Sequence, residues 1–462
     1  MSRYFGGRRA PDQGQGWVRP IVWPVLVPTT LIFGAEGAAM VVLGLSAIAG
    51  GASLALAALV VATVGIGQLA GSIPAGQLTT RYGERRVLVV ASLASTVTWA
   101  GAALVSSPAA LAGVGFVGGV ASAAFAVARQ SYTIDVVPHA YRARAMSLLG
   151  GSGRVGLVLG PLAGAGLQVW FGLAGGFVVA SAAAALAALT LLVVREPGDG
   201  GAPGAPGAAG ASQAAAASVP TTSRDRAAAQ DAVAADPRRT THPTTHPTTH
   251  PATLRELVRA HASVLATVGI GVVVINLARS LRPVLVPLAL SEAGADAHTT
   301  SLVVAAAAAA ELMLFYPAGV VMDRYGRRVV AVSCSGVMGV GLILMGALGA
   351  LEGLAGIVAG AVLLGIGSGI GSGVVKTLGA DAAPVRDRAT FLGVWNVLGE
   401  TGGAAGPLAL SALTAVASLA GAGVVLGVVA LAGAVGLTRW LSPGRAGPWA
   451  GTVSAGSEPP GA

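Results

Sequence analysis

Long apolar segments alternate with short polar ones along almost the whole chain. A helix needs about 20 apolar residues to cross the hydrocarbon core of a bilayer. Segments of that length predict an all-α membrane protein with twelve transmembrane helices, arranged as two pseudo-symmetric six-helix bundles. The predicted spans cover residues 21–47, 53–79, 87–106, 109–134, 145–168, 174–194, 263–290, 299–321, 329–350, 353–379, 389–415 and 418–441.

Composition excludes a soluble fold of this size. Of the 462 residues, 54% are hydrophobic and only 10% are charged, which leaves too little polar surface to face water. The net charge of +9 does not indicate nucleic-acid binding, because the arginines form short clusters beside span ends rather than one basic face. The single cysteine, Cys334, lies in the ninth span and excludes an intrachain disulfide framework.

The arginine clusters predict the orientation, since cytoplasmic loops retain positive charge. They occur before the first span and in alternate loops thereafter, whereas the short loops between them carry no lysine or arginine. We therefore expect a multi-pass protein of the cell membrane (the inner or plasma membrane) with both termini in the cytoplasm.

The chain divides by composition into five segments. Residues 1–20 form an N-terminal cytoplasmic tail, 21–195 the first bundle, 196–252 a linker, 253–441 the second bundle and 442–462 a C-terminal tail. The linker is rich in Gly, Pro, Ala, Ser and Thr, so we expect it to be disordered. Its three TTHP units place His242, His246 and His250 four residues apart. The intervening prolines oppose a helix and favour low-complexity sequence over metal or pH sensing.

Two near-repeats indicate that the bundles are related. PAGQLTTRYGERR begins at Pro74 and PAGVVMDRYGRR begins 243 residues later at Pro317, and each lies between apolar segments. Many secondary transporters are built from such internal repeats. An offset of 246 also aligns two GP motifs, in which glycines four apart let helices approach closely, and two aspartates. The motif residues are Gly156, Gly160 and Pro161 with Gly402, Gly406 and Pro407, and the aspartates are Asp135 and Asp381.

Charges inside the spans are candidate functional residues, because a charge at the helix centre costs about 2.5–3.5 kcal/mol on insertion scales. Arg129 and Lys376, the only lysine, lie near span ends, where extension to the membrane surface is favoured over contact with substrate. The six charges nearer mid-span are the candidates for substrate binding or proton coupling. They are Glu36, Arg154, Arg279, Arg282, Glu311 and Glu400.

The same offset pairs mid-span positions of opposite charge. Arg154 corresponds to Glu400, and Glu36 corresponds to Arg282. These charges could meet across a central cavity or pair within one half. A carboxyl group among apolar walls binds a proton more readily, so Glu36, Glu311 or Glu400 is a candidate proton carrier. The alternative role is a structural ion pair that holds helices together.

The chain resembles the major facilitator superfamily, in particular bacterial twelve-span drug:proton antiporters, over all but its tails and linker. The resemblance implies that the duplicated loops, with Asp135 and Asp381, form a cytoplasmic gate. Thr80 replaces the aspartate of the first loop motif, and the arginine near the outer start of span four is absent. The matching loop residues are Gly76, Arg81, Gly83, Arg85 and Arg86 in the first copy and Gly319, Asp323, Arg324, Gly326, Arg327 and Arg328 in the second.

The expected function is secondary active transport by alternating access, with proton-coupled efflux of a small hydrophobic or amphipathic compound. Import of a small organic anion is one alternative, and a non-transporting receptor or scaffold with the same fold is another. No nucleophile motif, metal cluster or phosphate loop with suitable context occurs, so an enzyme is not expected. The glycine run from Gly365 to Gly373 follows no strand, which disfavours a dinucleotide site. We expect a monomer in the bilayer with no cofactor and no nucleic-acid partner.

Overall fold

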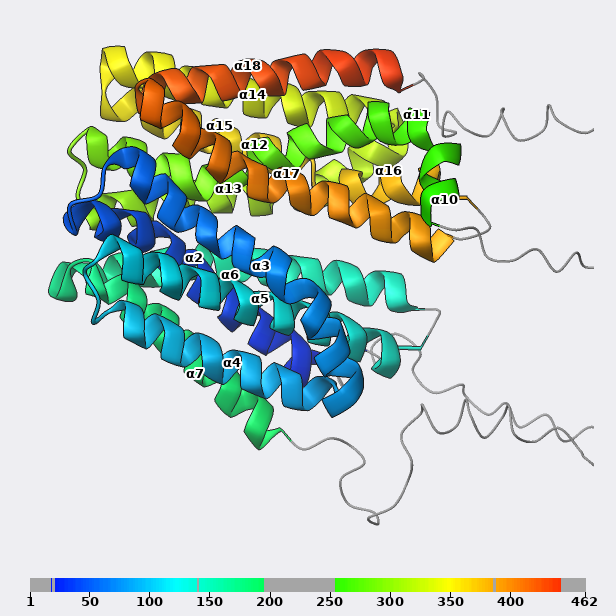
Figure 1. The fold of residues 1–462 in the computed structure, drawn as a ribbon, viewed down its shortest axis with the longest axis horizontal. Helices are drawn as coiled ribbons and strands as arrows, with labels where there is room; N and C mark the ends of the chain where they lie inside the picture. The colour runs from blue at the N-terminus through cyan, green and yellow to red at the C-terminus, as the bar shows by residue number, and fades with distance from the viewer. Residues whose placement is uncertain (1–17, 19–20, 139–140, 195–253, 385–387, 442–462) are drawn as a thin grey trace, which may run out of the picture. The chain divides into compact units, whose positions relative to one another are not determined.

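The computed structural model describes residue 18 and residues 21–138, 141–194, 254–384 and 388–441. Every regular element among these residues is helical (Figure 1). The N-terminal half contains η1 (Val22–Leu26), α2 (Val27–Ala49), α3 (Leu54–Tyr82), α4 (Glu84–Ala102), α5 (Pro108–Val136), α6 (Arg142–Phe171) and α7 (Ala174–Val193). The C-terminal half contains α10 (Leu254–Ala260), α11 (Ala262–Val264), η3 (Leu265–Gly269), α12 (Ile270–Glu292), α13 (Ala297–Tyr325), α14 (Arg327–Glu352), α15 (Leu354–Ile370), α16 (Val374–Ala382), α17 (Arg388–Val416) and α18 (Leu419–Trp440).

The predicted all-helical fold is confirmed in the described part of the chain. Helices occupy every segment that was predicted to span, and ten of the described helical segments are long and apolar enough to cross a membrane. The two that fall short are α4, which begins with Glu84, Arg85 and Arg86, and α17, which contains Glu400 among several glycines. The count of twelve spans therefore stays a prediction.

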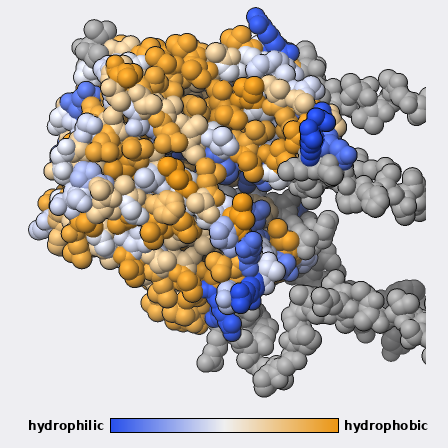
Figure 2. All heavy atoms as spheres, viewed as in Figure 1, coloured by the Kyte–Doolittle hydropathy of each residue, from blue (hydrophilic) through white to orange (hydrophobic). Residues whose placement is uncertain are grey.

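The predicted tails, the linker with its three histidines, and Thr253 lie outside the described residues. The five-segment division and the orientation of the termini also stay predictions. Hydrophobic side chains cover much of the face shown in Figure 2, and strongly hydrophilic residues gather toward its right-hand end. A lipid-facing surface of this kind is expected for a protein whose helices cross a bilayer.

Side-chain caps start four of the long helices. Ser53, Ser107, Asp296 and Ser418 each accept a hydrogen bond from the backbone N–H three residues ahead, at 2.9–3.3 Å. Each cap satisfies one of the helix's unpaired N–H groups. Hydrogen bonds from Thr299 hold the pKa of Asp296 below its usual range. This cap therefore contributes most above the ordinary aspartate pKa and weakens as the pH falls through the lowered value.

Glycine permits the sharp turn in each duplicated loop. Gly83 joins α3 to α4 with φ 84° and ψ 153°, and Gly326 joins α13 to α14 with φ 87° and ψ 166°. These angles fall in a region that is essentially restricted to glycine. The repeated RYG sequence thus serves the same backbone geometry in both halves.

We expect Gly83→Ala to lower the free energy of unfolding by about 1–3 kcal/mol, because alanine is strained at this backbone conformation. Gly76→Ala is the matched control. A Cβ atom at either position meets nothing within 4 Å, but Gly76 lies within α3, where alanine is favoured by roughly 0.5–1 kcal/mol. Denaturant titration in detergent should show opposite signs for the two variants. Equal effects would contradict the backbone explanation.

The GP motifs lie where helices touch backbone to backbone. In α6, a Cβ atom on Gly160 would be 2.8 Å from the Cα atom of Gly34 in α2, and Pro161 packs against Gly37. In α17, Gly402 packs against Val273 of α12 in the same way. The equivalent helix pairs of the two halves are therefore joined by the same small-residue contact. The remaining glycines of the motifs, Gly156 and Gly406, make close contacts with Thr30 and Gly34 and with Leu277 and Ser280, respectively.

The glycine run of span ten also has a packing role. A Cβ atom on Gly365 would meet the backbone of Ala307 in α13, and one on Gly367 would meet Met338 in α14. The run ends in a break, where Gly371 to Gly373 separate α15 from α16 and Gly373 has φ 83°. The predicted tenth span is thus a discontinuous helix.

Hydrogen bonds between described residues of the two halves are concentrated away from the duplicated loops. Ser301 donates to the Gln168 side chain at 3.0 Å, and the His298 ring lies 2.9 Å from the Ala165 carbonyl. Ser411 donates to a carbonyl at the start of α3 at 2.8 Å. These groups lie near the helix ends opposite the RYG turns. The other such bond between described residues is near mid-helix, at Glu311.

Candidate functional site

Glu311 joins the two halves through arginines. The Arg154 Nε atom on α6 lies 3.3 Å from Glu311 Oε1, and Arg282 on α12 donates to Oε2. The Glu311 side chain is 8% exposed, compared with 19% for Arg154 and 12% for Arg282. One buried carboxylate therefore holds one cation from each half of the chain.

Aromatic packing fixes the cation from the N-terminal half. The Arg154 guanidinium lies over the ring of Phe315, 4.6 Å from its centroid. Phe315 follows Glu311 by one helical turn on α13, so the carboxylate and the ring hold the same guanidinium. The close approach of Gly369 in α15 to the Glu311 backbone positions this part of α13.

Arg279 binds the broken helix rather than a carboxylate. Its Nε atom donates to the Ser368 hydroxyl at 3.0 Å, and its Nη2 atom donates to the carbonyls of Gly371 and Ser368 at 3.3 and 3.5 Å. Carbonyls at the end of a helix lack intrahelical hydrogen-bond donors. Arg279 provides donors for these carbonyls at the end of α15. Within α12, its Nη1 atom also donates to the Asn276 side chain at 3.4 Å. This geometry assigns Arg279 a positioning role and gives no direct support for the expected contact with substrate or proton.

Glu36 forms a second network within the N-terminal half. Its carboxylate accepts hydrogen bonds from Gln68 of α3 at 2.9 Å and Ser122 of α5 at 3.1 Å. Arg129 of α5 lies within electrostatic range of Glu36 but forms no ion pair with it among the described residues. Its guanidinium lies over the Phe33 ring, 4.6 Å from the centroid.

The expected extension of Arg129 to the membrane surface is wrong. Its Nε and Nη1 atoms are buried and have no hydrogen-bond partner among the described residues. The contact with Phe33 holds the guanidinium inside the protein. Lys376, on α16, has an exposed side chain and interacts electrostatically with Arg129, Arg154 and Glu400. Glu400 is also exposed.

The symmetry-related opposite charges do not pair with each other in the described structure. Arg154 and Arg282 both bind Glu311, whereas Glu36 binds neutral side chains and Glu400 has only an electrostatic interaction with Lys376. The sequence left open whether charges pair between the halves or within one half. Glu311 does both, since it binds Arg154 of the N-terminal half and Arg282 of its own half. The acid that forms them lies outside the 246-residue correspondence.

The duplicated loops are held differently. Arg327 pairs with Asp381 at 2.8 Å, whereas Arg85 donates to carbonyls at the end of α7 at 2.7 and 3.2 Å. Thr80 donates to the carbonyl of Gly76 within α3. Arg81 and Arg324 each lie over the adjacent tyrosine ring. In the part of the chain that the structure describes, no ion pair is formed by Arg86, Asp135, Asp323, Arg324 or Arg328. Gly319 is not required by close packing, because a Cβ atom there would meet nothing within 4 Å.

Sequence reasoning missed the neutral members of these networks. Gln68, Ser122 and Ser368 are polar residues within apolar spans, and that contrast was the available signal. Phe33 and Phe315 carried no signal, because an aromatic residue in a span is ordinary. No group of three His, Cys, Asp or Glu suited to a metal occurs among the described residues.

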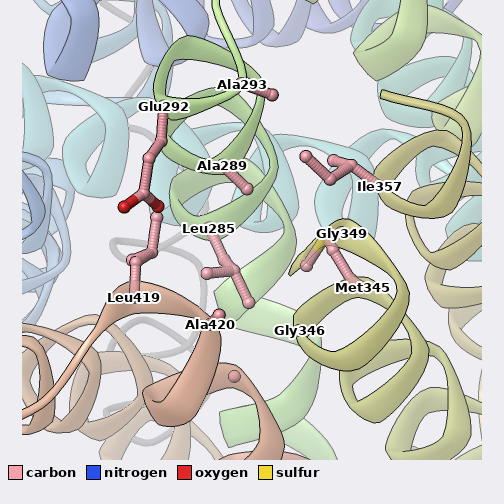
Figure 3. A pocket seen from close by; sticks show the side chains of 11 residues that line it. Leu285, Ala289, Glu292, Ala293, Met345, Gly346, Gly349, Ile357, Leu419 and Ala420 are labelled. Atoms are coloured by element: carbon pink, nitrogen blue, oxygen red, sulfur yellow. The ribbon is translucent and has the colours of Figure 1, made fainter. Parts of the chain in front are cut away.

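A separate pocket of about 240 Å³ lies among α12, α14, α15 and α18 (Figure 3). Its lining is largely apolar, and Glu292 is the carboxylate on its wall. The pocket contains none of the charged residues bound to Glu311 or Glu36. It lies near the end of α12 that is remote from the RYG turns.

Comparison with solved structures shows the same fold in several transporters at low sequence identity. A POT family transporter in complex with a thioalcohol-conjugated peptide has a TM-score of 0.67 and 16% identity, covering 91% of this chain and 96% of that one. The nucleoside transporter NupG gives 0.65 and 13%, covering 90% and 98%. A D-xylose–proton symporter gives 0.65 and 15%, covering 92% and 98%.

A search of curated proteins gave no match. The family model described as the Major Facilitator Superfamily matches residues 25–267 and 268–456, which is most of the chain. The match spans both halves, including the duplicated loops and all the charged residues of the two networks. The chain therefore belongs to the Major Facilitator Superfamily and is a membrane transporter rather than an enzyme.

Proposed function

We propose that the protein is a secondary active transporter in which protonation of Glu311 permits its halves to move during alternating access. The observation that carries this proposal is the sharing of one buried carboxylate by Arg154 and Arg282. A proton from the water on one side converts the Glu311 carboxylate to a neutral carboxyl group, which no longer attracts either guanidinium as an ion. The Arg154 contact between halves is then weakened, and release of the proton on the other side restores it.

The contacts between halves also support alternating access. They lie at mid-helix and at the end remote from the RYG turns. At the RYG end, Asp323 and Asp135 form no ion pair among the described residues. This pattern is the one expected when the halves close at one end and separate at the other. We assign the separating end to the cytoplasmic side, following the arginine clusters.

Efflux of a small amphipathic compound is the direction we propose, by a monomer in the cell membrane with both termini in the cytoplasm. The sequence GxxxGP in span five, with Gly156, Gly160 and Pro161, supports this choice because it resembles the antiporter motif of the superfamily. Carboxyfluorescein and rhodamine 123 are suitable amphipathic probes of opposite charge. Accumulation driven by a pH gradient in inverted vesicles would support export, whereas accumulation only in right-side-out vesicles would support import. A purified protein that moves neither probe nor protons would favour the receptor or scaffold.

The proton-linked movement can be tested without a substrate. Spin labels on Arg81→Cys and Arg324→Cys, in a Cys334→Ser background, would report the separation of α3 and α13 at the RYG end. Because Arg154 and Arg282 favour the charged form of Glu311, we expect the distance distribution to change only toward the acid end of a series from pH 4 to pH 8 in reconstituted protein. In Glu311→Gln, which is neutral at every pH, the distribution should be the acid one throughout.

Glu292→Gln is the matched control. It makes the same chemical change at an exposed carboxylate on the wall of the separate pocket, outside the Glu311 network. It should respond to pH as the unmodified chain does. Persistence of the full pH response in Glu311→Gln would overturn the assignment of the proton to Glu311.

A further inference from the structure

Two cations on the helices, Arg129 and Lys376, form no ion pair or hydrogen bond with another side chain among the described residues. Arg154 and Arg282 bind Glu311, and Arg279 binds the carbonyls at the α15 break. We propose that the Arg129 and Lys376 side chains bind the carboxylate or phosphate group of a small organic anion, which is the transported substrate. The inference rests on the proposed function only in calling that anion the substrate.

Arg129 supplies buried donors without acceptors. Its Nε and Nη1 atoms are inaccessible and have no hydrogen-bond partner in the described part of the chain. Glu36 does not fill this role, because its carboxylate forms no hydrogen bond with Arg129 among the described residues and accepts from Gln68 and Ser122 instead. Buried charged donors normally have partners. The missing acceptor is therefore expected from a molecule that binds there.

Lys376 brings a second positive charge within electrostatic range of Arg129. It interacts electrostatically with Arg129 and Arg154, which repel it, and with Glu400, which attracts it. Its side chain is exposed, so an anion from solution can reach it. An anion beside Lys376 would offset the repulsion that Lys376 experiences from the two arginines.

The backbone around Lys376 adds to this preference. Lys376 is the third residue of α16, and the N-cap position before that helix is Gly373, which has no side chain to accept a hydrogen bond. The first N–H groups of a helix and its dipole favour an anion. The unpartnered Arg129 guanidinium is an independent observation that points to the same ligand chemistry.

Aromatic rings favour an organic anion over inorganic phosphate. Phe33 and Phe315, both partly buried, lie against the guanidinium groups of Arg129 and Arg154. They provide apolar surface beside the cations. The predicted spans carry six basic side chains, Arg439 at a span end among them, and three acidic ones, so an anion also reduces an excess of positive charge. We therefore infer a ligand with an apolar or aromatic body and an anionic group.

Lys376 makes a direct test possible, because it is the only lysine in the chain. Pyridoxal 5′-phosphate is an anionic aldehyde that forms an imine with an amine and releases water. Borohydride reduces the imine and fixes the label, and peptide mass spectrometry separates Lys376 from the N-terminal amine. Pyridoxal, which lacks the phosphate, is the control reagent. The full chain in detergent at neutral pH is the sample.

We expect the anionic reagent to label Lys376 at least about tenfold faster than pyridoxal, because an oppositely charged site raises the local concentration of the reagent. Arg129→Gln should reduce this ratio toward one, whereas Arg129→Lys should retain most of it. Arg439→Gln, which removes an exposed arginine at the end of α18, should leave the ratio unchanged. A normal gel-filtration profile of Arg129→Gln shows that the variant is folded. Retained labelling in Arg129→Lys then shows that the lost preference comes from the missing positive charge.

Protection experiments identify the ligand class. Benzoate should slow labelling by pyridoxal 5′-phosphate more than benzamide, its neutral counterpart, or inorganic phosphate at equal concentration. Equal labelling by the two aldehydes, or an unchanged ratio in Arg129→Gln, would overturn the anion site. Protection by inorganic phosphate alone would overturn the organic substrate. None of these outcomes depends on the Glu311 distance measurement, so the two proposals fail separately.

Discussion

Replacing Glu311 by alanine is expected to lower the free energy of unfolding by about 3–5 kcal/mol, because it leaves two buried arginines without their counter-charge. Arg154 and Arg282 are only 19% and 12% exposed, so water cannot fully solvate them in place. Thermal exposure of the buried Cys334 thiol to a maleimide dye is a suitable readout, since Cys334 is the only cysteine and is inaccessible in the folded protein.

A double-mutant cycle separates the ion pair from other consequences of the substitution. Arg154→Gln should be markedly less destabilising in the Glu311→Ala background than in the unmodified chain, with a coupling of about 0.5–3 kcal/mol. Glu292→Ala, which removes an exposed carboxylate at the end of α12, should change stability little. Additive effects of Arg154→Gln and Glu311→Ala would show that the contact between halves contributes no stability.

Gly160→Ala is the second substitution with a large expected effect, a loss of about 3 kcal/mol from overpacking. The new Cβ atom would lie 2.8 Å from the Cα atom and 2.7 Å from the carbonyl carbon of Gly34. A backbone cannot rotate away as a side chain can, so α2 and α6 must separate. The expected result is an early thermal transition of purified protein and reduced yield from the membrane.

Gly166→Ala is the internal comparison for Gly160→Ala. Gly166 lies in the same helix, and a Cβ atom there would meet nothing within 4 Å. The change should be neutral or stabilising by up to about 1 kcal/mol, since alanine is the better helix former. If both variants lost stability equally, helix propensity or insertion rather than the α2–α6 contact would explain the loss.

Hydropathy was sufficient to predict the helices, whereas the relation between the halves that the internal repeats indicate stays a prediction. The broken helix was less accessible, because a glycine run is compatible with close packing, a turn, or both. Gly365 and Gly367 pack against neighbouring helices, whereas Gly373 adopts a positive φ. Sequence alone cannot assign these separate roles, since each depends on which backbone lies opposite.

The charged residues of the candidate site could be named from the sequence, but the contacts between them could not. Glu311 was named as a proton carrier, yet its binding to Arg154 depends on the rotation and depth of α6 and α13. Arg129 was set aside because its position near a span end usually allows contact with water. The Phe33 ring reverses that expectation by holding the guanidinium inside. Pairings across helices therefore required the three-dimensional structure.

Helix α12 connects the proposed proton site to the proposed anion site. Arg282 on this helix binds Glu311, and Arg279, three residues earlier on the same face, binds the carbonyls that precede α16 and Lys376. A shift of α12 that follows protonation of Glu311 must either carry the α16 helix with it or break the Arg279 hydrogen bonds. The affinity of Lys376 for an anion would then depend on the protonation of a carboxylate it never touches. Energetic coupling between proton and substrate would thus require one stiff helix and two arginines, with no competition between the ligands for a common residue.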